Sequence, residues 1–218
     1  MISNSKNQII GICGAIGSGK DTAADYLVEN NKFTRISFAS VLKDACANIF
    51  GWNRDMLEGK TAEDRHLREN VDEWWSSRLG IKNFSPRSAL QYVGTDLFRN
   101  SLHKDIWVYA LEKNIQKYDR VVISDVRFPN EIEMLKRLNG NIWWIHRGEK
   151  PGWFDSIQKI LLDTKSDEKA KEYITMKYPE IHESEWAWIA TEFDYVLSNN
   201  KSLSDLYEKV QEQLSKIQ

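Results

Sequence analysis

A glycine-rich segment with one lysine is the part of the sequence best suited to chemistry. It reads Gly14-Ala15-Ile16-Gly17-Ser18-Gly19-Lys20-Asp21-Thr22. Glycines at this spacing let consecutive backbone N–H groups converge on phosphate oxygens, while the lysine ammonium reaches the β and γ phosphates. The N-terminus of the helix that should follow adds to the attraction for an anion. The segment therefore predicts a P-loop that binds a nucleoside triphosphate, and each of its residues except Ile16 is a candidate ligand.

The residue after the P-loop lysine departs from the usual pattern. Asp21 stands where a serine or threonine hydroxyl normally contacts Mg²⁺, and the nearby hydroxyls are those of Ser18 and Thr22. A carboxylate can also hold Mg²⁺, directly or through water, so Asp21 is a candidate metal ligand. The alternative is a glycine-rich turn that only caps a helix. The order of strand, loop, lysine and helix favours phosphate binding.

A second polar group follows a later apolar run. Ser124-Asp125-Val126-Arg127 comes directly after Val121-Val122-Ile123. In parallel α/β sheets ligands bind at the carboxyl ends of the strands, so we expect Asp125 at the same sheet edge as the P-loop. Its carboxylate could hold Mg²⁺ or orient the attacking phosphate, and Arg127 could bind a phosphate bidentately. The alternative is that Asp125 caps the next helix and Arg127 forms a surface ion pair.

Strands and helices that could position these groups alternate along the chain. Apolar runs predict strands over residues 8–13, 35–38, 121–125, 141–146 and 195–197. Helical spacing and capping residues predict helices over 19–30, 39–50, 86–100, 105–118 and 130–138, and from Leu203 onward behind Ser202. Residues 53–83 show no clean period, and 151–185 form a charged, helical segment outside the strand series. Such alternation favours a parallel sheet covered on both faces.

Composition bounds the class of protein. The 218 residues can bury one α/β core with an inserted lid. The net charge is −2, and Lys and Arg are spread along the chain. The sequence therefore lacks the concentrated positive charge that binds a long nucleic acid. The two cysteines, Cys13 and Cys46, fit core positions and a reducing, cytoplasmic setting. No run of membrane-spanning or signal-peptide character occurs, so we expect no membrane partner.

The motifs and their order resemble the bacteriophage deoxynucleoside monophosphate kinases. The matching segments are the P-loop ending in Gly19-Lys20-Asp21-Thr22, Leu90-Gln91-Tyr92-Val93-Gly94-Thr95-Asp96 with Trp107-Val108, Ser124-Asp125-x-Arg127, His146-Arg147-Gly148, His182-x-Ser184-Glu185, and Tyr195-Val196-Leu197-Ser198-Asn199. Asp21 after the P-loop lysine is shared with this family. The segments 52–83 and 153–181 do not match it.

The resemblance implies transfer of the γ-phosphoryl group of ATP, with Mg²⁺, to the 5′-phosphate of a deoxynucleoside monophosphate. Such a reaction depends on positioning and charge neutralisation. Lys20 would contact the β and γ phosphates, and Asp125, Arg127 and Arg147 would complete the catalytic group. Asp21 and Asp125 would be metal ligands. Asn199, after the last strand, would lie near adenine.

The acceptor side of the site rests on the same resemblance. The candidate substrate-binding residues are Arg87, Gln91, Tyr92, Asp96, Arg99, Arg127 and Glu185. Gln91 and Tyr92 would read or stack on the base. Asp96 would bond the base or the sugar, or else pair with a basic neighbour on its helix. Arg87 and Arg99 are twelve residues apart on the predicted helix, so we do not expect both to point into one cleft.

The fold implied is a three-layer α/β/α P-loop kinase fold with a mostly parallel sheet. Residues 1–218 would form one kinase domain, with an acceptor-binding region at 51–103 and a lid at 148–185. A phage-encoded enzyme would work in the host cytoplasm, and the sequence is compatible with a homodimer without fixing the oligomeric state. Two other interpretations remain: a P-loop kinase of another acceptor, of the dephospho-coenzyme A or phosphomevalonate kinase type, and a regulatory module that binds nucleotide without catalysis.

Overall fold

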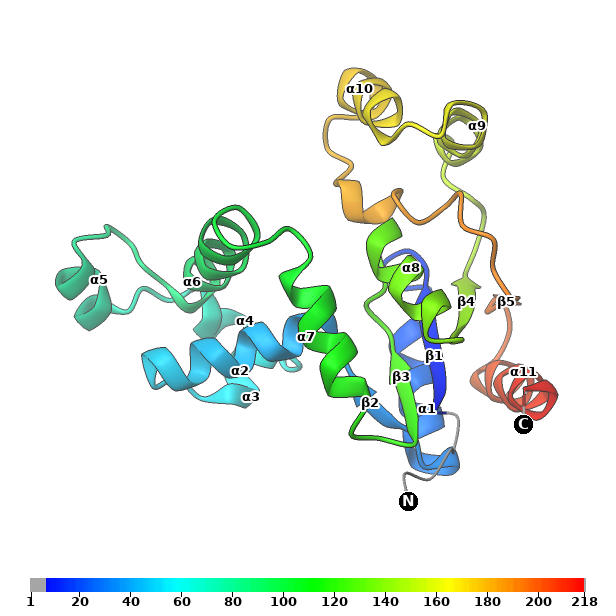
Figure 1. Ribbon diagram of the computed structural model, residues 1–218, viewed down its shortest axis with the longest axis horizontal. Helices are drawn as coiled ribbons and strands as arrows, with labels where there is room; N and C mark the ends of the chain where they lie inside the picture. Colours follow the sequence, from blue (N-terminus) through cyan, green and yellow to red (C-terminus); the bar gives the residue numbers. More distant parts are fainter. Residues whose placement is uncertain (1–6, 218) are drawn as a thin grey trace. The chain divides into compact units, whose positions relative to one another are not determined.

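The computed structural model describes residues 7–217 as two compact units (Figure 1). The first unit comprises the described residues up to Ile36 and those from Ile115 onward, and it contains the whole sheet. The second comprises Ser37–Asn114 and is helical. No helix within 7–217 has the length and apolar character needed to span a bilayer.

The sheet of the first unit has five strands in the order β2-β3-β1-β4-β5. They are β1 (Gln8–Cys13), β2 (Thr34–Ile36), β3 (Arg120–Ile123), β4 (Asn141–His146) and β5 (Tyr195–Ser198). Every pair of neighbours is parallel, as the sequence predicted, and β1 pairs with β3 on one side and β4 on the other. The chain adds β2 and β3 on one side of β1 and then β4 and β5 on the other, so the strand order reverses at β1. Open α/β sheets bind ligands at the carboxyl ends of the strands beside such a reversal.

Helices cover both faces of this sheet, which confirms the predicted three layers. Side chains alternate between the faces along β1. Ile10 and Ile12 are fully buried in a cluster with residues of α1 (Lys20–Asn31) and α11 (Leu203–Lys216). Gly11 faces α8 (Pro129–Arg137), so closely that an added Cβ would lie 2.6 Å from a methyl of Leu135. Figure 1 shows α8 on one side of the strands and α1 on the other.

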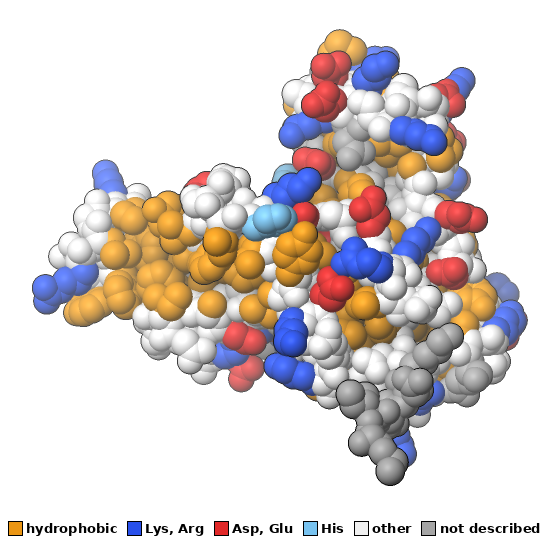
Figure 2. Space-filling view, in the orientation of Figure 1, with side chains coloured by type: hydrophobic (Ala, Val, Ile, Leu, Met, Phe, Trp, Pro, Cys, Tyr) orange, Lys and Arg blue, Asp and Glu red, His pale blue; other side chains and the backbone are white. Residues whose placement is uncertain are grey.

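The second unit packs short helices around Cys46, Leu57 and Val93. Its elements are α2 (Phe38–Phe50), α3 (Arg54–Glu58), α4 (Ala62–Glu69), α5 (Glu73–Leu79), α6 (Pro86–Gln91), the π-helix η1 (Tyr92–Arg99) and most of α7 (Ile106–Ile115). Figure 2 shows a broad hydrophobic area on its visible face. Glu58 accepts hydrogen bonds from Lys43 and Arg54, both 2.8 Å long. Burial raises the pKa of Glu58, but these two cations outweigh it and lower the pKa to about 2.

Parts of the sequence-based prediction need correction. Strand β2 ends at Ile36 rather than at residue 38, because Ser37 is the extended N-cap of α2 and the next residue already begins the helix. Residues 53–83 contain three helices where no period was predicted. Each is too short to show one, and side chains of Asn53, Thr61 and Asp72 cap their N-termini.

The predicted helix over 86–100 is only partly α-helical. After α6 the backbone widens into η1, where the Asn100 N–H donates to Thr95 O at 2.9 Å, five residues back. Leu97, which lies within these wider turns, is 45% exposed. The indole N–H of the buried Trp107 donates to the carbonyl of Gly94 inside this segment at 2.9 Å.

The segment predicted as a helical insertion does form helices. α9 (Phe154–Thr164) and α10 (Asp167–Lys177) pack against each other and are followed by the short 3₁₀-helix η2 (Glu183–Glu185). Their role as a lid stays a prediction.

Candidate functional site

The P-loop connects β1 to α1 and buries its lysine. Lys20 is 7% exposed, and its ammonium donates to the carbonyl of Ala15 at 2.7 Å. The loop is closed by a bond from the Ser18 N–H to the same carbonyl at 3.2 Å. Gly19, the N-cap of α1, has φ +100° and provides no side chain to cap the helix. The first N–H groups of α1 are thus available to an anion, whereas α11 is capped by Ser202.

The charge of Lys20 is poorly stabilised by its surroundings. Burial lowers the pKa of this ammonium, and the nearby positive charge of Arg127 lowers it further. The carboxylates of Asp21 and Glu185 act in the opposite direction without reversing the shift. A bound polyphosphate would supply the missing negative charge, so this environment favours anion binding.

Asn199 supports the P-loop from the end of β5. Its side chain is 9% exposed and its Nδ2 donates to the carbonyl of Ser18 at 2.9 Å. Gly19 packs so closely that an added Cβ would lie 2.3 Å from that nitrogen. The Asn199 N–H also donates to His146 O at 2.8 Å, which ties β5 to the end of β4. The residue predicted to lie near adenine is therefore also part of the loop's packing.

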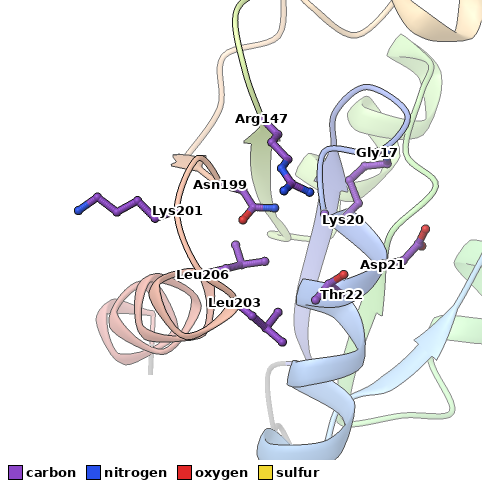
Figure 3. Close-up of a pocket in the computed structure, with 10 residues that line it drawn as sticks. Gly17, Lys20, Asp21, Thr22, Arg147, Asn199, Lys201, Leu203 and Leu206 are labelled. Carbon is purple, nitrogen blue, oxygen red and sulfur yellow. The ribbon is translucent and has the colours of Figure 1, made fainter.

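A pocket of about 310 Å³ lies between the P-loop and α11. It is lined by Gly17, Gly19, Lys20, Asp21, Thr22, Arg147, Asn199, Lys201, Leu203 and Leu206. Figure 3 shows Arg147 and Asn199 pointing toward the P-loop from the ends of β4 and β5, while the side chain of Lys201 extends away. Cations and loop N–H groups at one side and leucines at the other suit a ligand with both a phosphate and an apolar ring. Neither leucine was among the residues predicted for the nucleotide site, because both belong to the helix predicted from Leu203 onward.

Arg127 follows β3 and is fixed by two contacts from the segment around η2. Its Nη1 donates to Glu185 Oε1 at 2.8 Å and to Ser184 Oγ at 3.1 Å. Its backbone N–H donates to Glu131 at 2.8 Å, at the start of α8. Asp125 lies half-buried two residues after β3, because the strand ends at Ile123 rather than at residue 125 as predicted. The structure thus brings together three predicted residues that are distant in sequence. Arg127 bonds Glu185, and the charges of both act on the ammonium of Lys20.

The start of α1 has the chemistry of a magnesium site. The Asp21 side chain is 72% exposed and accepts a hydrogen bond from Ser124 Oγ at 2.9 Å. Within 7–217 no three His, Cys, Asp or Glu residues gather into a site that would hold a metal by itself. Mg²⁺ bound together with substrate phosphates needs only one or two carboxylates, so this donor set fits it. Asp21 would hold the ion, with Asp125 as the second candidate.

The predicted acceptor residues other than Arg127 and Glu185 all lie in the second unit. Arg87 forms an ion pair with Glu69 at 3.6 Å, and Arg99 is half-exposed. Gln91, Tyr92 and Asp96 are exposed. Arg87 and Arg99 are not on one continuous α-helix, because Arg99 lies in the π-helix η1, so their spacing of twelve residues does not fix whether they diverge.

A second, shallower pocket of about 620 Å³ lies within this unit and contains none of the predicted acceptor residues. Its lining combines Trp52, Met56 and other apolar residues with carboxylates such as Asp55 and Glu63. A negative lining repels phosphate, so it does not suit a nucleotide.

The parallel sheet, the P-loop and the buried lysine define a protein of the P-loop nucleotide-binding class. A sequence model described as deoxynucleotide monophosphate kinase matches residues 57–156. This match includes most of the segment 52–83, so the expectation that this segment departs from the family was wrong. A putative deoxynucleotide monophosphate kinase of Acanthamoeba polyphaga mimivirus is 31% identical over 217 residues, covering 93% of each chain. The deoxynucleoside-5′-monophosphate kinase of Escherichia phage T5 is 31% identical over 60% of this chain and 72% of its own. The chain belongs to the deoxynucleotide monophosphate kinase family, a family of phosphotransferases.

Among solved structures, the dephospho-CoA kinase of Campylobacter jejuni covers 97% of this chain and 98% of its own, with 16% identity and a TM-score of 0.45. The shikimate kinase of Aquifex aeolicus covers 96% and 98%, with 13% identity and a TM-score of 0.45. Likenesses this distant do not distinguish one acceptor from another.

Proposed function

We propose that this protein transfers the γ-phosphoryl group of ATP to the 5′-phosphate of a deoxynucleoside monophosphate, giving the diphosphate and ADP. The main support for the proposal is Lys20, a buried P-loop lysine whose positive charge is not balanced by nearby negative charge. The chain that carries it belongs to this kinase family. The adenine and ribose of ATP would occupy the pocket beside Leu203 and Leu206, with Asn199 at its edge.

In this proposal the reaction depends on positive charge around the transferred group. Lys20 and the N–H groups at the start of α1 would hold the β and γ phosphates. Mg²⁺ bound at Asp21 and Asp125 would neutralise phosphate charge and help to align the phosphates. Arg147 from β4 and Arg127 from β3 would stabilise the charge that develops in the transition state.

The roles proposed for the acceptor-binding residues follow the family resemblance. Arg87 and Arg99 would contact the acceptor phosphate, while Gln91 and the exposed Tyr92 ring would bind the base. Asp96 would bond the base or deoxyribose. Support for these roles is the match of the family's sequence pattern to this region, which includes all five residues. Viral relatives also support a place for the enzyme in the cytoplasm of a host cell.

A panel of deoxynucleoside and ribonucleoside monophosphates, with Mg-ATP as donor and ADP release as readout, tests this proposal. We expect turnover with at least one deoxynucleotide. Replacing Lys20 with alanine should reduce this turnover by a factor of about 10² to 10³, the usual effect of removing one preorganised hydrogen-bond donor from an active site. Lys216→Ala is the matched control, because this lysine lies in the last turn of α11, donates to Glu212 and does not line the pocket. ATP binding without transfer to any deoxynucleotide would refute the proposal.

A further inference from the structure

Arg35, in the short strand β2, contacts the start of α1 through both arms of its guanidinium. Nη1 donates to Asp25 Oδ1 at 2.8 Å, and Nη2 donates to Ser124 Oγ at 2.7 Å and to Asp21 Oδ1. Ser124 Oγ in turn donates to the same Asp21 oxygen at 2.9 Å. Arginine, serine and aspartate thus form a closed triangle at the position where the P-loop has its unusual carboxylate.

The carboxylate of Asp21 brings a negative charge into a site built for anions. Asp21 lines the pocket beside the P-loop, and its negative charge interacts electrostatically with the Lys20 ammonium. A serine or threonine hydroxyl at this position would carry no charge. Unless a cation offsets it, a fixed negative charge here repels the polyphosphate of ATP.

We infer that Arg35 is the positioning residue that makes an aspartate-containing P-loop compatible with ATP: it offsets the charge of Asp21 and, with Ser124, fixes its carboxylate. The inference rests on the proposed function. Asp25 is one helical turn further along α1, about 6 Å from Asp21 at 1.5 Å per residue. It anchors the guanidinium from the side away from the P-loop.

The same contacts could instead serve only to join β2 to α1, and the two roles differ in what they predict. If the contacts of Arg35 only join β2 to α1, removing them would weaken the binding of every ligand, whether or not Asp21 is present. Charge compensation requires the carboxylate of Asp21 and a charged ligand. Replacing Asp21 with serine restores the common P-loop hydroxyl and removes the charge that Arg35 offsets.

The experiment measures equilibrium binding of ATP in EDTA, of Mg-ATP and of adenosine by calorimetry, with no turnover needed. The variants are Arg35→Gln, Arg35→Lys, Asp21→Ser and the double variant Asp21→Ser/Arg35→Gln. Asp25→Asn is the matched control, because it removes the other ion pair of the same guanidinium.

We expect Arg35→Gln to weaken metal-free ATP about fivefold, the size of one contact between unit charges in a high-dielectric setting. Arg35→Lys should retain most of the affinity. The loss should be smaller for Mg-ATP, where the ion neutralises Asp21, and adenosine should be unaffected. Asp25→Asn should bind ATP no more weakly than the wild type.

Without the Asp21 carboxylate the guanidinium is no longer held at the start of α1 beside the P-loop and, of its two ion pairs, keeps only the one with Asp25. The double variant should therefore bind metal-free ATP within about twofold of Asp21→Ser alone. An equal loss from Arg35→Gln in both backgrounds, no loss in the wild-type background, or an equal loss for adenosine would overturn the inference. A wild-type protein that binds ATP but fails this cycle leaves the proposed function standing. One that does not bind ATP overturns both.

Discussion

The close packing of Asn199 against Gly19 makes a specific and measurable prediction. A Cβ added at Gly19 would lie 2.3 Å from Asn199 Nδ2, in a backbone conformation with φ +100°. A Cβ added at Gly17, where φ is +77°, would meet nothing within 4 Å. Gly17→Ala is therefore a matched control that introduces backbone strain without a steric clash.

The expected costs follow from this difference. Gly17→Ala should lower the free energy of unfolding by about 1–2 kcal/mol, the cost of a left-handed conformation for an L-residue. Gly19→Ala adds about 1–3 kcal/mol for overpacking, for a total of about 2–5 kcal/mol. Asn199→Ala removes the clashing amide, so in that background Gly19→Ala should cost no more than the Gly17→Ala control.

Urea unfolding followed by tryptophan fluorescence measures the free energies of unfolding of the wild type, the three single variants and the double variant Gly19→Ala/Asn199→Ala. A double-mutant cycle between positions 19 and 199 then gives the coupling energy, which should exceed about 1 kcal/mol for residues in such contact. Equal costs for Gly17→Ala and Gly19→Ala, or additive effects of Gly19→Ala and Asn199→Ala, would refute the packing described for the P-loop.

Three further predictions concern other groups. Glu185→Gln should reduce kcat about tenfold with little change in ATP affinity, because Arg127 loses the carboxylate that positions it; unchanged kcat would contradict this role. Burial raises the pKa of both thiols, that of Cys46 to about 11, so a thiol reagent at pH 8 should label Cys13 and Cys46 only after unfolding. Glu58→Gln should lower the free energy of unfolding by about 1–2 kcal/mol at pH 7. Since the pKa of Glu58 is lowered in the folded state, this difference should be complete above pH 4.5 and vanish toward pH 2, as acid unfolding of both proteins would show.

The sheet and the P-loop were predictable because they depend on local patterns. Buried parallel strands are continuous apolar runs, and the P-loop combines a strand, glycines, a lysine and a helix in one short stretch. Lys20, Arg147 and Asn199 therefore line one pocket, as their places after β1, β4 and β5 suggested. All three follow strands whose carboxyl ends meet at one sheet edge.

The parts that were missed depend on contacts between distant residues. Nothing near Arg35 in the sequence indicates that it pairs with Asp21, because the pairing follows from the place of β2 at the sheet edge. The π-helix is equally hidden, since the indole of Trp107 bonds the carbonyl of Gly94 from another helix. The capped helices of the second unit did carry a local signal in Asn53 and similar N-cap residues, but their lengths gave no periodicity.

The central claim is that the γ-phosphoryl group of ATP passes to a deoxynucleoside monophosphate at the P-loop. The most direct measurement uses ATP labelled in its γ-phosphoryl group, with mass spectrometry of the acceptor after incubation with the wild type and with Lys20→Ala. The account predicts label in the β-phosphoryl group of a deoxynucleoside diphosphate for the wild type and a loss of about 10² or more for the variant. Label that appears only in inorganic phosphate, or equal transfer by both proteins, would contradict it.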